Sequence, residues 1–171
     1  MKNINSLVDI IYNVHQHLQK YAVSSVNRSL TIRNWLIGYY IVEYEQNGQD
    51  RAKYGTKIIA ELAGKLKNIK GMDERSLRNF RLFYQRYPQI GNYIQQTSIW
   101  GSVTPKLITP EKWGSLTPEF RDTPDRIPAK KIVNNLSYTH LEQLIRIEDD
   151  LKRTFYEIEA IKGTRSVREL N

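Results

Sequence analysis

Hydrophobic residues recur every three or four positions over most of the chain, and this spacing predicts a mainly α-helical protein. Residues 4–21 are the first such segment, which we expect to be a helix packed on the rest of the protein. A second helix is expected over residues 24–45, because Ser24 or Ser25 can cap its start. Gly38 lies inside it, where glycine costs about 1 kcal/mol relative to alanine, so a close helix crossing is expected there.

Residues 54–87 contain two amphipathic patterns separated by a turn signal, and the rest of the chain is organised around them. Their apolar positions are Ile58, Ile59, Leu62, Leu66 and Ile69 in the first half and Leu77, Phe80, Tyr84 and Tyr87 in the second. Between the halves, Gly71 can adopt the left-handed conformation that ends a helix, and Asp73 can cap the next helix. This spacing predicts a helix-turn-helix.

The second helix of this pair turns a basic face outward. At about 100° per residue, the side opposite its apolar stripe carries Arg75, Arg78, Asn79, Gln85 and Arg86. Residues 51–88 contain ten Lys and Arg against three acids, so their net charge of +7 accounts for nearly all of the +8 of the chain. Such a concentration of charge favours contact with nucleic acid. The alternative is an ordinary solvated surface, because Arg and Lys are soluble helix formers.

All six prolines of the chain fall within residues 88–135, and a continuous helix is therefore excluded there. We expect a long, irregular, proline-rich arm, or short extended pieces such as residues 99–103. Trp100 and Trp113 lie in this arm. They can be buried against their own domain or can bind a partner, and both roles stay open.

Helical spacing resumes after residue 135. Ser137 can cap a helix that runs to Ile161, and Gly163 can stop it. The apolar face of this helix consists of Leu141, Leu144, Ile145, Leu151, Phe155 and Ile158. We therefore expect residues 1–163 to form one helical module, and residues 164–171 to begin a linker or helix toward a further domain.

The composition argues against several kinds of catalytic site. The 171 residues include no cysteine, which removes disulfides, thiolate nucleophiles and cysteine-ligated zinc, and fits a reducing cytoplasm. No serine lies in a Gly-x-Ser-x-Gly elbow, and Gly64-Lys65 lacks the rest of a phosphate-binding loop. No apolar run is long enough to span a membrane. We expect a cytoplasmic protein without a cofactor, a metal ion or a membrane partner.

One pattern imitates a metal-dependent nuclease, which needs two acids and a lysine on neighbouring strand ends. Asp125 and Asp150-Leu151-Lys152 have suitable residue types. Asp150, however, lies in a strongly helical stretch and Asp125 in the proline-rich one, so the pattern does not support a catalytic site. A self-sufficient nuclease is the weakest hypothesis, and it predicts Mg²⁺-dependent cleavage that is lost in Asp150→Ala.

An ordered set of short motifs resembles the N-terminal domain of YhcG-type bacterial proteins. The motifs are Asn34-Trp35-Leu36-Ile37-Gly38, Leu62-Ala63-Gly64-Lys65-Leu66, Leu77-Arg78-Asn79-Phe80, Leu136-Ser137-Tyr138-Thr139-His140 and Ser166-Val167-Arg168-Glu169-Leu170. The family pattern has Trp-Ser-His where this chain has Tyr138-Thr139-His140, and an aromatic residue in place of Arg165, which indicates a subfamily. The resemblance covers nearly the whole chain except the proline-rich arm.

The resemblance implies a mostly helical domain, connected with DNA binding, that precedes a C-terminal PD-(D/E)XK nuclease domain where this sequence ends. We therefore expect a non-catalytic DNA-binding module that targets an associated nuclease. The residues expected to contact bases or phosphates are Arg75, Arg78 and Asn79, and those expected to hold the DNA backbone are Lys65, Lys67, Lys70 and Arg86.

The alternative is a module for protein interaction or homo-oligomerisation. In that case Trp100 and Trp113 of the arm, together with the aromatic residues Tyr39, Tyr40 and Tyr44, bind another subunit or a nuclease partner. The basic helix is then solvated surface.

Overall fold

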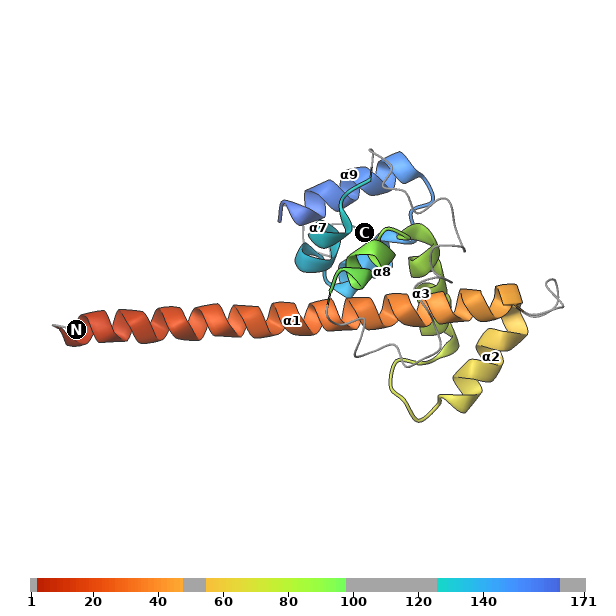
Figure 1. Ribbon diagram of the computed structural model, residues 1–171, viewed down its shortest axis with the longest axis horizontal. Coiled ribbons are helices and arrows are strands. Elements are labelled where there is room, and N and C mark those ends of the chain that lie inside the picture. The colour runs from red at the N-terminus through yellow and green to blue at the C-terminus, as the bar shows by residue number, and fades with distance from the viewer. Residues whose placement is uncertain (1–2, 48–54, 98–125, 164–171) are drawn as a thin grey trace.

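The computed structural model describes residues 3–47, 55–97 and 126–163. Over these ranges all regular secondary structure is helical, in seven helices, which confirms the predicted mainly α-helical fold class. Figure 1 shows that the longest helix, α1 (Ile4–Asn47), crosses the globular part of the protein and projects far beyond it at its N-terminal end. None of the described helices combines the length and the apolar character needed to cross a membrane.

α1 is one continuous helix of 44 residues, so the predicted break between residues 21 and 24 is wrong. A serine can stay inside a helix when its hydroxyl bonds to the carbonyl one turn earlier, and the hydroxyl of Ser29 donates to the carbonyl of Ser25 at 2.9 Å. No glycine or proline precedes Gly38, so no residue with a strong helix-ending preference lies in this stretch. The helix ends at Asn47, close to the predicted end.

Residues 4–21 were expected to pack on the rest of the protein, and the structure contradicts this expectation. Ile11 and Leu18 are 59% and 58% exposed. The reason is the continuity of α1, because a straight helix of this length extends beyond the globular part before the body can cover it (Figure 1). Burial begins at Thr31, and from there α1 forms one wall of the core.

The central pair of helices consists of α2 (Gly55–Lys65) and α3 (Glu74–Arg86). The first pattern was expected to stay helical to Ile69, but α2 ends at Lys65, and the two helices are joined by residues 66–73, which we call the α2–α3 connection. Both predicted end signals of this connection are confirmed. Gly71 has a positive φ of 82°, and the carboxylate of Asp73 accepts the backbone N–H of Ser76 at 2.9 Å.

α1 and α3 form the most extensive helix contact of the described structure, and they cross at Gly38. A Cβ atom at this position would lie 1.9 Å from the carbonyl oxygen of Phe80, so only glycine fits. The predicted close crossing at Gly38 is therefore confirmed. At this crossing the backbones of α1 and α3 are in contact. The buried residues of α3 are Leu77, Phe80, Phe83 and Tyr84.

The predicted irregular arm of residues 88–135 is helical at both of its described ends. α4 (Ile90–Gln95) follows Pro88, and α7 (Ala129–Asn135) follows Pro128. Proline is compatible with the start of a helix because it needs no N–H partner there, and the carbonyl of Pro88 accepts the N–H of Gly91 at 3.0 Å. Trp100 and Trp113, with residues 98–125, lie outside the described residues.

The single helix expected over residues 137–161 is two helices, α8 (Tyr138–Leu144) and α9 (Asp150–Ile161). Ser137 caps α8 as predicted, but Asp149 starts a new helix, because its side chain accepts the N–H of Lys152 at 2.9 Å. The change of direction turns the predicted apolar face outward after the break. Leu151 is 85% exposed, while the buried residues of α9 are Arg153, Glu157 and Ala160.

α3 lies between two hydrophobic clusters. The larger cluster joins α1, α3, α4, α7 and α8, and its fully buried members include Trp35, Phe83, Ile90, Ile94, Ile132 and Leu141. A smaller cluster beneath α2 contains Ile41, Ile59, Met72, Leu77 and Phe80. Because the same helix contributes to both clusters, its position is fixed along its whole length, and its free surface is limited to its N-terminal end and one flank.

Candidate nucleic-acid interface

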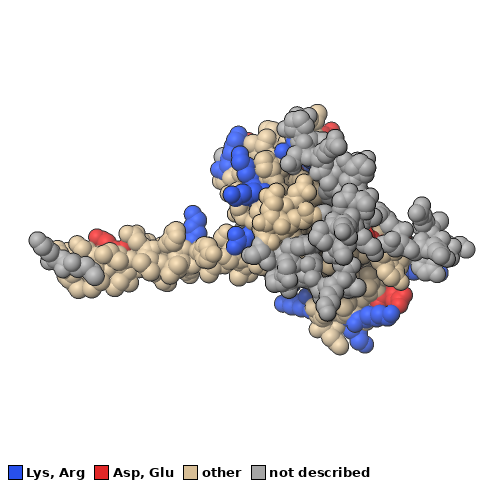
Figure 2. Space-filling model, viewed as in Figure 1, with Lys and Arg blue, Asp and Glu red and all other residues tan. Residues whose placement is uncertain are grey.

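The lobe formed by α2, the α2–α3 connection and the first turns of α3 carries most of the cations that the sequence predicts to bind nucleic acid. Figure 2 shows blue Lys and Arg side chains gathered on this lobe, which Figure 1 places at the lower right of the view, with acids at its edge. The members that the structure describes as exposed are Lys65, Lys67, Lys70, Arg75 and Arg78.

Lys67, Lys70 and Arg75 form no ion pair and no side-chain hydrogen bond within the part of the chain that the structure describes. Lys67 and Lys70 lie in the α2–α3 connection, and Arg75 lies in the first turn of α3. The helix dipole favours acids over cations in a first turn. The position of Arg75 in the first turn is therefore not explained by a contribution to helix stability. An anion that binds at this end of α3 would meet three cations without an ion-pair partner in the described structure, beside the carboxylates of Asp73 and Glu74.

Lys65 and Arg78 are paired, but only with exposed carboxylates one turn away. Lys65 lies 2.6 Å from Glu61, and Arg78 lies 3.0 Å from Glu74, and each of these four side chains is at least half exposed. The hydrogen bond from Lys65 lowers the pKa of Glu61 and raises the pKa of Lys65. Exposed pairs of this kind contribute little to stability, so both cations can exchange their carboxylate for a phosphate oxygen.

Asn79 and Arg86 are placed differently from the other predicted residues. The amide of Asn79 donates to Glu142 of α8 at 2.9 Å, and the guanidinium of Arg86 lies 3.9 Å from Asp150 of α9. Both side chains are partly buried. The structure thus separates them from the exposed cations, and their contacts connect α3 to the two C-terminal helices.

Lys57 is an exposed cation of the same lobe that the predicted set omits. It lies near the start of α2 and forms no ion pair among the described residues. Lys57, Glu61 and Lys65 are spaced one helical turn apart. This spacing places all three on one face of a helix, and it is the signal in the sequence that could have identified Lys57.

The described residues contain no cluster of three or more side chains suited to hold a metal ion. Asp150, the acid of the nuclease-like pattern, lies in the first turn of α9 and is 2.5 Å from the guanidinium of Arg153. That contact lowers the pKa of Asp150. Asp125 lies outside the described residues. The geometry around Asp150 is that of a helix-terminal ion pair, and no strand end is present beside it in the described structure.

Comparison with known proteins identifies relatives of the chain. A model of the DUF1016 N-terminal domain family matches residues 10–107. The chain is also similar to the protein named "Putative nuclease YhcG" from Escherichia coli (strain K12), with 33% identity over 157 residues. The match covers 86% of this chain and 38% of that protein, so the chain spans well under half of the relative's length. No solved structure matches the chain.

Proposed function

Because this chain belongs to the DUF1016 N-terminal domain family, we propose that it is a non-catalytic DNA-binding module that brings an associated PD-(D/E)XK nuclease to its substrate. The observation that carries the proposal is the basic end of α3, by which we mean Lys67, Lys70, Arg75 and Arg78. These four side chains are exposed, and three of them have no partner among the described residues.

The contact proposed is mainly with the phosphate backbone. Lys and Arg that neutralise phosphates release condensed counterions, and this release supplies much of the affinity of DNA-binding proteins. Arginine can in addition bind a guanine edge or a phosphate with two parallel hydrogen bonds. Arg75 and Arg78 are therefore the residues proposed to contact bases or phosphates, while Lys65, Lys67 and Lys70 hold the backbone.

The packing of α3 supports an approach through its N-terminal end. One side of α3 is covered by α1, and another is tied to α8 through Asn79 and Glu142. A helix held in this way cannot lie in a groove along its whole length. Its first turns and the α2–α3 connection can enter, and in this arrangement Asn79 and Arg86 act by fixing the angle of α3 and do not contact DNA.

The association with a nuclease rests on the relatives. The chain matches a domain family, and its E. coli relative carries the name "Putative nuclease YhcG" and is more than twice as long as the matched region. The resemblance to YhcG-type proteins implies that catalysis belongs to a C-terminal domain. No catalytic role is proposed for the described residues, because they contain no group of three or more side chains suited to hold a metal ion. Ser137 Oγ lies 2.7 Å from Nδ1 of His140, but this serine caps α8 and also accepts the backbone N–H of His140.

The test is a fluorescence anisotropy titration of a labelled DNA duplex with the protein at several salt concentrations. If five cations neutralise phosphates, log affinity should fall against log salt with a slope of about −4 to −5. Arg75→Glu combined with Arg78→Glu should abolish binding. Lys130→Glu combined with Lys131→Glu is the matched control, because it makes the same charge change at exposed positions of α7. Absence of binding at low salt, or equal losses in both double variants, would overturn the proposal.

A second candidate function is favoured by a different observation. Hydrophobic side chains are exposed along the N-terminal half of α1, among them Ile11, Leu18 and Tyr21. Contiguous exposed hydrophobic surface is a mark of protein interaction sites. The second candidate is therefore an interaction or oligomerisation module of the same nuclease system, and it is compatible with DNA binding through the basic end of α3.

A further inference from the structure

The exposed hydrophobic side chains of α1 follow the spacing of a coiled coil. They recur at alternate intervals of three and four residues, which places them on one stripe of the helix. We call this stripe the α1 seam, and its members are Ile4, Leu7, Ile11, Val14, Leu18 and Tyr21. Apart from the partly buried Leu7, each member is between 52% and 68% exposed.

The same seven-residue repeat continues into the core of the protein. After two polar positions, Ser25 and Arg28, it reaches Ile32, Trp35, Tyr39 and Val42, all of which are buried. One hydrophobic repeat thus runs through the whole of α1, and the globular part covers only its C-terminal portion. The N-terminal portion of α1 has the hydrophobic repeat of a buried helix, but no described part of the protein covers it.

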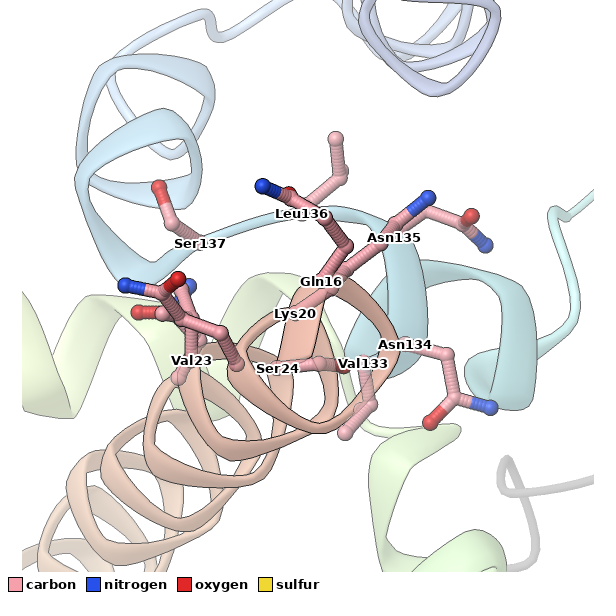
Figure 3. A pocket seen from close by; sticks show the side chains of 11 residues that line it. Gln16, Lys20, Val23, Ser24, Val133, Asn134, Asn135, Leu136 and Ser137 are labelled. Carbon is pink, nitrogen blue, oxygen red and sulfur yellow. The ribbon is translucent and has the colours of Figure 1, made fainter. Parts of the chain in front are cut away.

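The globular part leaves the α1 seam open. Figure 3 shows Gln16, Lys20 and Ser24 on the side of α1 that faces residues 133–137, where they line a polar groove of about 640 Å³. At about 100° per residue, Gln16 and Lys20 point to the side of α1 opposite Leu18. The polar side of this segment therefore faces the body, and the seam points away from it.

The seam is also free of charge. Residues 4–21 contain two charged side chains, Asp9 and Lys20, and both lie on the side of the helix opposite the seam. Val8 and Ile10, which are 56% and 46% exposed, flank the seam and widen it. Two identical copies would thus meet without repulsion between like charges.

We propose that the α1 seam pairs with the α1 seam of a second copy of this chain to form a coiled coil over residues 4–21. The inference gives a specific form to the second candidate function. A second copy is the occupant because it brings the same uncharged heptad stripe of the same length. The other exposed hydrophobic stripe of the described chain, Leu151, Phe155 and Ile158 of α9, is only half as long.

The area available lies near the lower limit for a specific dimer. A large hydrophobic side chain carries on the order of 100 Å² of apolar surface. The exposed parts of the seam and its two flanking residues therefore amount to roughly 400–500 Å² per helix, and a pair approaches the roughly 1,000 Å² that a specific interface needs. A helical segment with so little tertiary packing is marginal in water by itself, so pairing also explains how this half of α1 stays helical.

The experiment is sedimentation equilibrium of the full chain without DNA, over a range of protein concentrations. The expected result is a reversible dimer. Val14→Asp places a charge in the seam of both partners and should raise the dimer dissociation constant by at least about tenfold. Val26→Asp is the matched control, because Val26 is similarly exposed on α1 (59% against 52%) but lies beyond residues 4–21, over which the coiled coil is proposed. It should change the dissociation constant less than about threefold. Val14→Leu keeps the seam hydrophobic and should remain dimeric.

Each other outcome overturns the proposal. A monomer at all concentrations means that the seam does not pair with a second copy. Equal losses in Val14→Asp and Val26→Asp mean that aspartate weakens α1 itself, and far-ultraviolet circular dichroism of both variants would show the same loss of helix. A dimer that Val14→Asp leaves intact uses another surface. Because no DNA is present, a monomeric result leaves the DNA-binding proposal untouched, and failure of the anisotropy test leaves the dimer untouched.

Discussion

Gly38 of α1 lies directly against the backbone of Phe80 of α3, and a Cβ atom at residue 38 would be 1.9 Å from the Phe80 carbonyl oxygen and 2.5 Å from its carbonyl carbon. The contact is made by backbone atoms, which cannot rotate away as a side chain can. The distance between α1 and α3, and with it the orientation of the basic end of α3, therefore depends on the absence of a side chain at this position.

Gly38→Ala should destabilise the protein. The methyl group would push α1 and α3 apart, and such overpacking costs typically 1–3 kcal/mol or more, which outweighs the gain of about 1 kcal/mol in helix propensity. We expect the free energy of unfolding in urea to fall by about 2 kcal/mol.

Gly64→Ala is the control for this prediction. Gly64 also lies in a helix, but a Cβ atom there would meet nothing within 4 Å. The substitution should therefore raise the free energy of unfolding by about 0.5–1 kcal/mol. Equal effects of the two substitutions would contradict the steric explanation for Gly38.

Trp35→Phe should remove a hydrogen bond that fastens α1 to the end of α3. The indole N–H of Trp35 donates to the backbone carbonyl of Tyr87 at 2.8 Å, and both residues are fully buried. Phenylalanine is smaller and leaves this carbonyl without its donor, so we expect a loss of about 2–3 kcal/mol in chemical denaturation. Tyr44→Phe, at a 69% exposed position of the same helix, should change stability by less than about 0.5 kcal/mol.

Glu157 should give the protein an unusual pH dependence. Its burial raises its pKa above the ordinary value of 4.5, although the hydroxyl of Tyr87 donates to it at 2.7 Å and Arg153 lies 3.7 Å away. The folded protein therefore binds this proton more tightly than the unfolded chain does. The resulting stabilisation is complete below about pH 4.5 and is lost as the pH rises through the raised pKa.

Glu157→Gln removes this titration, since the amide stays neutral at every pH and can still accept a hydrogen bond from Tyr87. The stability of the unmodified protein relative to this variant should fall as the pH is raised from 4.5, and urea denaturation at a series of pH values measures the difference. Glu159→Gln makes the same chemical change on the same helix and serves as the control. A relative stability that instead rises with pH would contradict the prediction.

Asp73→Ala should loosen the start of α3. The Asp73 carboxylate accepts the N–H of Ser76 at 2.9 Å and the hydroxyl of the same residue at 2.8 Å, and the backbone hydrogen bond lowers the pKa of Asp73. Loss of such a cap costs about 1 kcal/mol. Thermal unfolding should show the decrease, and Asp73→Ser should retain most of the stability because serine also caps helices. If alanine and serine behave alike, the cap does not contribute as proposed.

Helix ends and caps, which depend on only a few neighbouring residues, could be predicted from the sequence. Gly71 and Gly163 take positive φ values, and Asp73 and Ser137 cap the helices that follow them, as their residue types predict. These features depend on the glycine conformation or on a hydrogen bond three residues away. The helical class and the buried face of α3 were predictable for a similar reason, since periodicity alone identifies which residues share one side of a helix.

The residues of the candidate site could be predicted only in part from the sequence. The sequence correctly gathers Lys67, Lys70 and Arg75 near one end of a helix, because they are neighbours along the chain. It does not reveal that Asn79 faces Glu142, which is 63 residues away. A helical wheel shows that a side chain points outward from its own helix, but it does not show whether that side chain contacts another helix.

The sequence by itself determined the helical class, the local helix ends and the glycine at the helix crossing. The tertiary structure decided that α1 is continuous, that the helix after Ser137 is divided, and which hydrophobic stripes are covered. Leu18 and Trp35 belong to the same heptad repeat of α1, yet the first is 58% exposed and the second is fully buried. The physical reason is that amphipathic spacing creates a surface that gains from burial, whereas the partner that buries it is set by contacts between segments distant in the chain or on another molecule.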